Sequence, residues 1–182
     1  MKIIKKILFT IVIISVIGFA IISDVFDRRQ YYSTFPPEEE LTEFFMYKTT
    51  EEQEKASEEN FGNEKYNFPR EEVAEVKLFR NTFLVSRLTS KTLSESSKTK
   101  IISFFNDPVN FDWSETTWEV TDSEYILRFY NKEEKEIGKI WLCLEDCGMI
   151  KSIPFSPNMK YGGLSEKGRK NINRILNKIL AE

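Results

Sequence analysis

The feature that most constrains this chain is an uncharged apolar run near its N-terminus, from Ile7 to Ile22. A helix that crosses a bilayer needs about 20 mostly apolar residues. The run reaches that length when its neighbours are included, because the lysines that precede it can extend their side chains to the membrane surface. The sequence therefore predicts one N-terminal transmembrane helix, which anchors the chain to a membrane through residues 3–26.

A secretory signal peptide is the alternative to this permanent anchor. Such peptides combine a basic start, an apolar stretch of about 7–15 residues and a small-x-small cleavage site. Gly18-Phe19-Ala20 is an imperfect version of that site. The apolar run is slightly long for a signal peptide and continues past Ala20 into two isoleucines, which favours an uncleaved anchor. Cleavage after Ala20 would instead give an exported soluble protein.

Basic residues on the two sides of the run indicate how it crosses the membrane. Lys2, Lys5 and Lys6 precede it, and two arginines, Arg28 and Arg29, follow it. Because positive residues stay on the cytoplasmic side, we expect a cytoplasmic N-terminus and an extracytoplasmic C-terminal domain, as in a bacterial envelope protein. The arginines and the tyrosines at 31 and 32 would lie in the headgroup layer.

Charge and composition exclude several classes of function. Beyond the three N-terminal lysines, 23 of the 26 basic residues remain against 29 acidic ones, which argues against a nucleic-acid partner. The chain has no histidine, so catalytic triads, histidine zinc sites and histidine general bases are excluded. We expect no cofactor and no bound metal, and we expect the partner to be another protein.

Three segments are predicted, namely an anchor at residues 1–27, an acidic juxtamembrane helix and linker at 28–68, and a globular domain at 69–182. The linker has ten glutamates between Glu38 and Glu64. Glutamates directly after Pro36-Pro37 suit the first turn of a helix. We therefore expect a helix over residues 38–48, followed by a solvated helix tail or flexible linker.

The globular domain has the pattern of an α+β fold. Alternating or continuous apolar segments predict short strands around residues 73–78, 83–88, 116–120, 124–130, 137–144 and 149–155. A helix is expected over residues 93–106, behind a capping box formed by Thr92 and Glu95. A second begins near Ser165 and carries an apolar stripe at helical spacing. The prediction is an antiparallel sheet of four to six strands covered by two helices, preceded by the transmembrane helix.

The two cysteines, Cys143 and Cys147, lie in the segment LCLEDCG. A disulfide between them suits an oxidising compartment. In a straight strand their Cα atoms would be about 13 Å apart, too far for a disulfide, so the bond requires a tight turn. Two packed thiols remain the alternative.

Two further groups are candidates for binding. Phe111 and Trp113 lie in a polar loop and are predicted to be exposed anchors of a protein-contact surface, because aromatic residues dominate interface energetics; the alternative is that they cover one end of the sheet. Gly162, Gly163 and Ser165 precede the last helix and resemble a weak anion site, since free N–H groups at a helix start attract anions.

The preferred functional hypothesis is a membrane-tethered extracytoplasmic domain without catalytic activity that binds another protein, such as an envelope assembly or toxin-neutralising factor. The alternative is an envelope hydrolase that uses carboxylates. Its carboxylates would come from Glu145 and Asp146, together with Asp112 or Glu115 from another loop.

Overall fold

The computed structural model describes residues 2–82, 89–114, 123–145 and 147–182. The strands predicted at 83–88 and 116–120 lie outside these ranges. Within them the chain contains five α-helices, five strands and three short 3-10 helices. In order they are α1 (Lys2–Ser33), α2 (Glu38–Phe44), α3 (Thr50–Asn60), η1 (Glu64–Tyr66), β1 (Glu75–Arg80), β2 (Ser90–Thr92), α5 (Glu95–Asn106), η2 (Pro108–Asn110), β3 (Tyr125–Tyr130), β4 (Glu136–Cys143), β5 (Met149–Ile153), η3 (Pro157–Met159) and α6 (Glu166–Ala181).

The strands form one antiparallel sheet in the order β2-β1-β3-β4-β5. Side chains alternate between its two faces, as the twofold period of a strand requires. Leu127 and Phe129 of β3 point to the same face as Ile140 and Leu142 of β4 and are buried there. The predicted α+β fold is confirmed.

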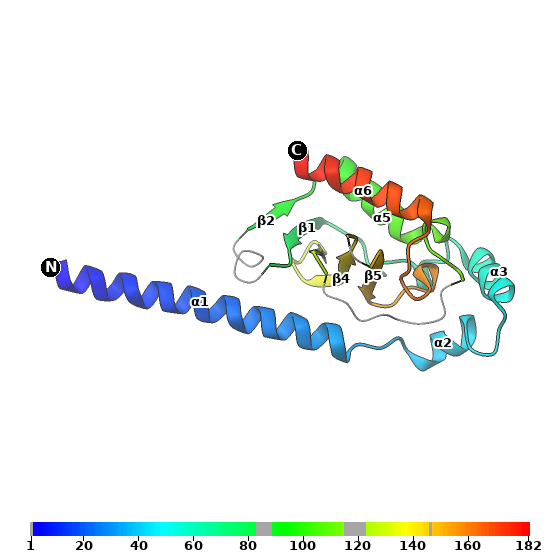
Figure 1. Cartoon of the computed structure of the whole chain (residues 1–182), viewed down its shortest axis with the longest axis horizontal. Coiled ribbons are helices and arrows are strands. Elements are labelled where there is room, and N and C mark those ends of the chain that lie inside the picture. The colour runs from blue at the N-terminus through cyan, green and yellow to red at the C-terminus, as the bar shows by residue number, and fades with distance from the viewer. Residues whose placement is uncertain (1, 83–88, 115–122, 146) are drawn as a thin grey trace.

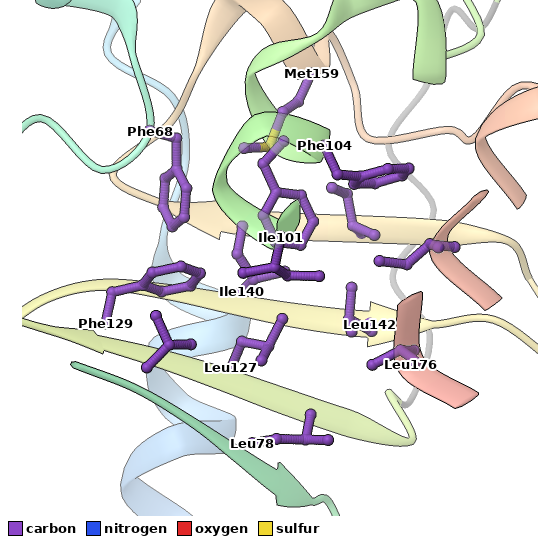
Figure 2. Packing of buried hydrophobic residues seen from close by; sticks show 14 of the residues in the cluster. Phe68, Leu78, Ile101, Phe104, Leu127, Phe129, Ile140, Leu142, Met159 and Leu176 are labelled. Carbon is purple, nitrogen blue, oxygen red and sulfur yellow. The ribbon is translucent and has the colours of Figure 1, made fainter. Parts of the chain in front are cut away.

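The main hydrophobic core lies between this face of the sheet and helices α5 and α6 (Figure 1). Figure 2 shows Ile101 and Phe104 of α5 and Leu176 of α6 directed toward the strands. Phe68 closes the core beside Phe129, with ring centroids 4.9 Å apart. Each such side chain contributes about 1.5–3 kcal/mol when it is fully buried, so this face supplies most of the apolar burial of the domain.

Helix α6 packs through the stripe that its sequence predicts, with Ile172, Leu176 and Ile179 buried. Ser165 is its N-cap and accepts a hydrogen bond from the N–H of Gly168 at 3.0 Å. Gly168 itself lies against η2, because a Cβ atom added there would be 1.9 Å from the carbonyl oxygen of Asn110. The absence of a side chain at this position therefore sets how closely the helix approaches the loop.

Helix α5 starts two residues later than predicted. Its N-cap is Ser94, whose hydroxyl accepts from the N–H of Ser97 at 3.3 Å. Thr92 instead ends strand β2 and is paired with Lys77 of β1. The predicted capping box of Thr92 and Glu95 is wrong because sheet pairing takes the threonine out of the helix.

The opposite face of the sheet lies against the C-terminal half of α1, as Figure 1 shows in blue. This 32-residue helix is about 48 Å long at the usual rise per residue. Its large apolar side chains are exposed from Ile3 to Ile22, for example Ile3 at 74% and Phe9 at 67%, whereas Ala20 is fully buried. It is the one helix of the described chain that is long and apolar enough to cross a membrane.

The acidic segment between the anchor and the domain packs against the domain. Helices α2 and α3 follow one another there, and Thr49 caps α3 in a capping box with Glu52. Phe44, Phe45 and Tyr66 form a second hydrophobic cluster with Trp113. Glu40 of α2 is paired with Arg70 at 2.5 Å. Residues 49–68 are thus largely helical and packed on the domain through this cluster, and the three predicted segment boundaries stay predictions.

Replacing Gly168 with alanine tests the close approach of α6 to η2. We expect Gly168→Ala to destabilise the full-length protein by about 1–3 kcal/mol, the usual cost of overpacking, because the new Cβ meets a backbone oxygen that cannot move freely. Urea unfolding in detergent measures the change. Asn173→Ala, at an exposed position of the same helix, should stay within about 0.5 kcal/mol, and equal effects of both substitutions would contradict the packing argument.

Candidate functional site

The face of the sheet that meets α1 carries a row of basic residues. The strand register places Lys77 opposite Arg128, and Arg128 opposite Lys139. Like charges directly opposite each other on neighbouring strands are destabilising. A row of this kind therefore needs acidic partners before it can be covered by another element.

Asp27 of α1 supplies the central negative charge. One carboxylate oxygen lies 2.6 Å from the Arg128 guanidinium and the other 2.9 Å from the Lys139 ammonium. Glu136 completes the network at 3.1 Å from both cations. Gln30, one turn further along α1, accepts a hydrogen bond from Lys139 at 2.7 Å.

This network is buried, which makes it sensitive to the loss of any member. Asp27 and Lys139 are each only 2% exposed. Removing one partner of a buried ion pair leaves an uncompensated charge and costs about 3–5 kcal/mol. Asp27 therefore fixes both the position and the orientation of α1 on the sheet.

Aromatic contacts continue the interface toward the end of α1. The ring of Tyr31 packs edge-on against Trp141, with centroids 5.3 Å apart. Tyr32 in turn packs edge-on against Tyr31 at 5.4 Å. The ring of Tyr31 is thus directed to the sheet, and its placement in the headgroup layer stays a prediction. Arg28 pairs with Asp24 one turn earlier, at 3.0 Å.

Helices α5 and α6 border an open groove on the far side of the domain. Its volume is about 500 Å³, and Phe104 and Ile175 form its apolar part. Lys100, Arg174 and Lys178 also line it, and all three are exposed. The groove thus combines apolar side chains with three cations and one carboxylate, that of Asp107.

Phe111 and Trp113 are not exposed, so the predicted contact surface does not exist in this form. They are 3% and 8% exposed. Phe111 joins the main core, and Trp113 packs against Phe45 of the acidic segment at 6.3 Å between ring centroids. Its indole N–H donates to the carbonyl of Pro108 at 3.0 Å. The prediction failed because the acidic segment folds over this loop.

The predicted anion site uses its N–H groups internally. Gly162 donates to the carbonyl of Met159, Leu164 to Gly148 and Ser165 to Asn110. Gly162 and Gly163 are buried, and Gly162 has the positive φ of 88° that favours glycine. Gly162 therefore serves a turn, and the N–H groups of Gly162, Leu164 and Ser165 already have acceptors.

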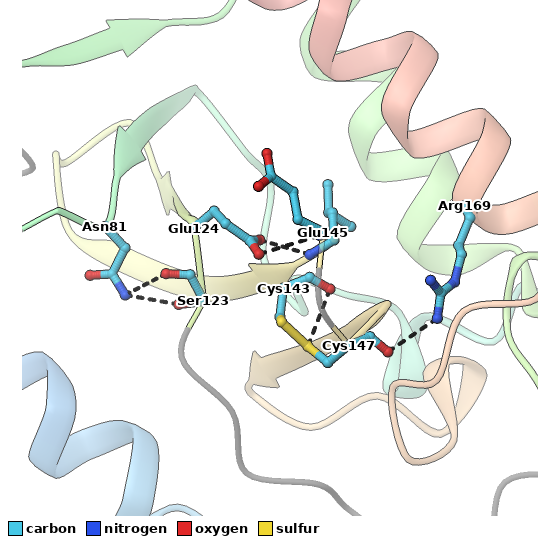
Figure 3. Close-up of a disulfide and its surroundings, with 8 residues drawn as sticks. Asn81, Ser123, Glu124, Cys143, Glu145, Cys147 and Arg169 are labelled. Carbon is cyan, nitrogen blue, oxygen red and sulfur yellow. Dashed lines mark hydrogen bonds between the residues drawn. A yellow bond between two sulfur atoms is a disulfide. The ribbon is translucent and has the colours of Figure 1, made fainter.

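Cys143 and Cys147 are joined by a disulfide, with Cα atoms 5.7 Å apart. Figure 3 shows the bond at the end of β4, with Glu124 and Arg169 beside it. The carboxylate of Glu124 accepts from the N–H groups of Leu144 and Glu145, at 2.7 and 3.3 Å. Arg169 of α6 donates to the carbonyl of Cys147 at 3.1 Å. The backbone groups of Leu144, Glu145 and Cys147 beside the bond therefore have side-chain partners from other parts of the chain.

Among the carboxylates considered for hydrolysis, Asp112 has local structural partners. Asp112 accepts from the hydroxyl and the N–H of Ser114 at 2.6 and 2.9 Å, and these bonds hold its pKa below the usual range. Asp146 and Glu115 lie outside the described residues. Within the described ranges, no group of three or more potential acidic, cysteine or histidine ligands could hold a metal ion.

Comparisons with protein-family models, with curated proteins and with solved structures found no match. The candidate sites are therefore argued from the geometry of this chain alone.

Sequence reasoning missed the interface between α1 and the sheet, although one signal was present. Lys139 interrupts the otherwise apolar strand IGKIWLCL, and a lysine inside a strand covered on both faces needs a buried acidic partner. The sequence does not identify that partner, because Asp27 lies 112 residues away.

Neutralising Asp27 tests whether the ion-pair network holds α1 on the sheet. Asp27→Asn keeps the volume but leaves Arg128 and Lys139 short of a counter-charge, so we expect a loss of about 3–5 kcal/mol. Adding Lys139→Met should recover part of that loss, and a double-mutant cycle on the full-length protein in detergent measures the coupling. Glu133→Gln, at an exposed carboxylate, is the control, and additive effects of the two network substitutions would contradict direct pairing.

Proposed function

We propose that the protein is a membrane-tethered extracytoplasmic accessory domain that binds another protein and is not itself an enzyme. The observation that carries the proposal is the continuity of α1. Its first 22 residues leave their large apolar side chains exposed, which water does not favour, and five residues after Ile22 the same helix is paired with the sheet through Asp27. A membrane around the first part would hold the domain directly at its surface.

The short distance between the two parts of α1 defines the kind of tether. Five helical residues correspond to about 8 Å of rise. Because Asp27 is buried against β3 and β4, the domain cannot swing freely as it would on a flexible stalk. Such a fixed support suits a protein that presents one surface to a partner in or near the same membrane.

The extracytoplasmic side is supported by two features of the chain. Three lysines precede the apolar run, and positive residues remain in the cytoplasm. The disulfide between Cys143 and Cys147 is of a kind that persists in oxidising compartments.

The groove between α5 and α6 is the surface we propose for the partner. Its floor of Phe104 and Ile175 and its edges of Lys100, Arg174 and Lys178 complement an amphipathic helix with an acidic face, which is a common occupant of grooves between helices. A protein partner fits better than a nucleic acid, because the chain as a whole is acidic, with a net charge of −3.

A carboxylate-dependent hydrolase is the alternative function. A general acid in such an enzyme needs a raised pKa, whereas the hydrogen bonds from Ser114 lower the pKa of Asp112. This difference argues against Asp112 as the general acid of such an enzyme.

The tether can be tested by membrane extraction and intact mass measurement in the native host. We expect the protein to resist extraction with alkaline carbonate and to have the full-length mass less two hydrogens, which correspond to the disulfide. The outer layers of the envelope are permeabilised while the inner membrane stays intact. A protease added from outside should then digest the domain. A soluble product beginning at Ile21 would contradict the proposed tether. A domain that is protected until the inner membrane is lysed would contradict its orientation.

The partner surface can be tested by crosslinking at Ser103, an exposed residue that lines the groove. A photoreactive phenylalanine analogue placed there should capture an acidic protein in the membrane fraction. Arg174→Glu with Lys178→Glu should abolish the adduct, because the basic edge becomes acidic. Lys132→Glu with Lys135→Glu, on the exposed β3–β4 hairpin, makes the same charge change and should leave it intact. If the adduct persists after Arg174→Glu with Lys178→Glu, or is lost equally after both pairs of substitutions, the groove is not the partner surface.

A further inference from the structure

A separate cavity lies where the end of α1 meets strands β4 and β5. Its volume is about 100 Å³. Tyr31 and Tyr32 of α1 line one side, Trp141 and Lys151 of the sheet line another, and Phe155 and Tyr161 complete the aromatic wall. It is on the face of the sheet opposite the groove between α5 and α6, and its walls come from segments that are far apart in sequence.

Lys151 is the charged group of this cavity. Its side chain is partly buried, and its ammonium group donates to the carbonyl oxygen of Tyr31 and lies 4.7 Å from the centroid of that ring. Burial lowers the pKa of Lys151. In the described part of the chain, no carboxylate forms a salt bridge with it, unlike Lys139 on the neighbouring strand, which pairs with Asp27 and Glu136.

The other lysine at the cavity has a different orientation. Lys160 is 2% exposed, and its ammonium group donates to the carbonyl of Trp113, on the side of the second hydrophobic cluster. Lys151 is therefore the cation that a molecule in the cavity would meet among aromatic rings.

We propose that this cavity binds a small monoanionic amphiphile, with its carboxylate on Lys151 and a short apolar chain against Tyr31, Trp141 and Phe155. A half-buried ammonium without a counter-ion is costly, and a carboxylate supplies the missing charge in a charge-assisted hydrogen bond. A phosphate fits less well, because the single ammonium of Lys151 balances one negative charge, whereas phosphate carries more than one at neutral pH.

The size of the cavity limits the apolar part of the ligand. A dry cavity of about 150 Å³ in another protein takes up benzene, so the smaller volume here accommodates only a short aliphatic chain. A longer acyl chain would have to leave through the open side. The chemical class is therefore a carboxylic acid with a short chain, or the carboxylate end of a longer one.

The position of the ligand would couple it to the anchor. Tyr31 belongs to α1, whereas Trp141 and Lys151 belong to the sheet, so an occupant contacts both sides of their interface. A ligand that binds only the docked arrangement stabilises that arrangement by mass action. The proposal rests on the described cavity and is independent of the proposed protein partner and of membrane orientation.

Hexanoate is the probe for the test. The full-length protein is placed in phosphatidylcholine nanodiscs, and saturation-transfer difference NMR measures hexanoate binding after subtraction of empty nanodiscs. We expect Lys151→Met to raise the Kd by about tenfold or more, the loss of one charge-assisted hydrogen bond. Lys151→Arg should retain binding, and Lys132→Met, at an exposed lysine paired with Glu72, should leave the Kd unchanged.

A neutral probe completes the design. Hexan-1-ol, which has the same chain without the charge, should bind at least about tenfold more weakly than hexanoate. Absence of hexanoate binding, equal binding by Lys151→Met, or equal binding of hexan-1-ol would overturn the proposal.

Discussion

The carboxylate of Asp27 between Arg128 and Lys139 is the interaction on which the arrangement of this molecule depends. Without it, Glu136 alone would face two cations on neighbouring strands under a helix, and a net positive charge would remain where water is excluded. With it, the face of the sheet away from the core can be covered. The aromatic contacts of Tyr31 and the cavity beside Lys151 are present because α1 is held there.

The two faces of the sheet are covered by different kinds of interaction. One face packs Leu127 and Ile140 against α5 and α6, and apolar burial of this kind is not directional. The other face uses ion pairs and hydrogen bonds, whose geometry is specific. The apolar face thus supplies stability. The polar face determines the rotation of α1 about its axis and its position along the sheet.

Local patterns in the sequence identified much of the fold, and long-range contacts account for what they missed. The stripe of Ile172, Leu176 and Ile179 predicted α6, because helical periodicity is a local property. The burial of Trp113 was not predictable in this way, since it depends on Phe45 folding back from a segment that is acidic overall. The partner of Lys139 could not be predicted either, because an ion pair between residues 112 positions apart produces no periodic pattern in the sequence. The candidate site was therefore less predictable than the elements that carry it.

The burial of Ala20 bears on how the N-terminal segment is processed. This residue lies within the regular helix α1 and is fully buried. A peptidase must bind its substrate locally unfolded, and the cost of that unfolding rises once a segment is packed. If a peptidase acts at this site, docking of α1 and cleavage after Ala20 are therefore competing events in time.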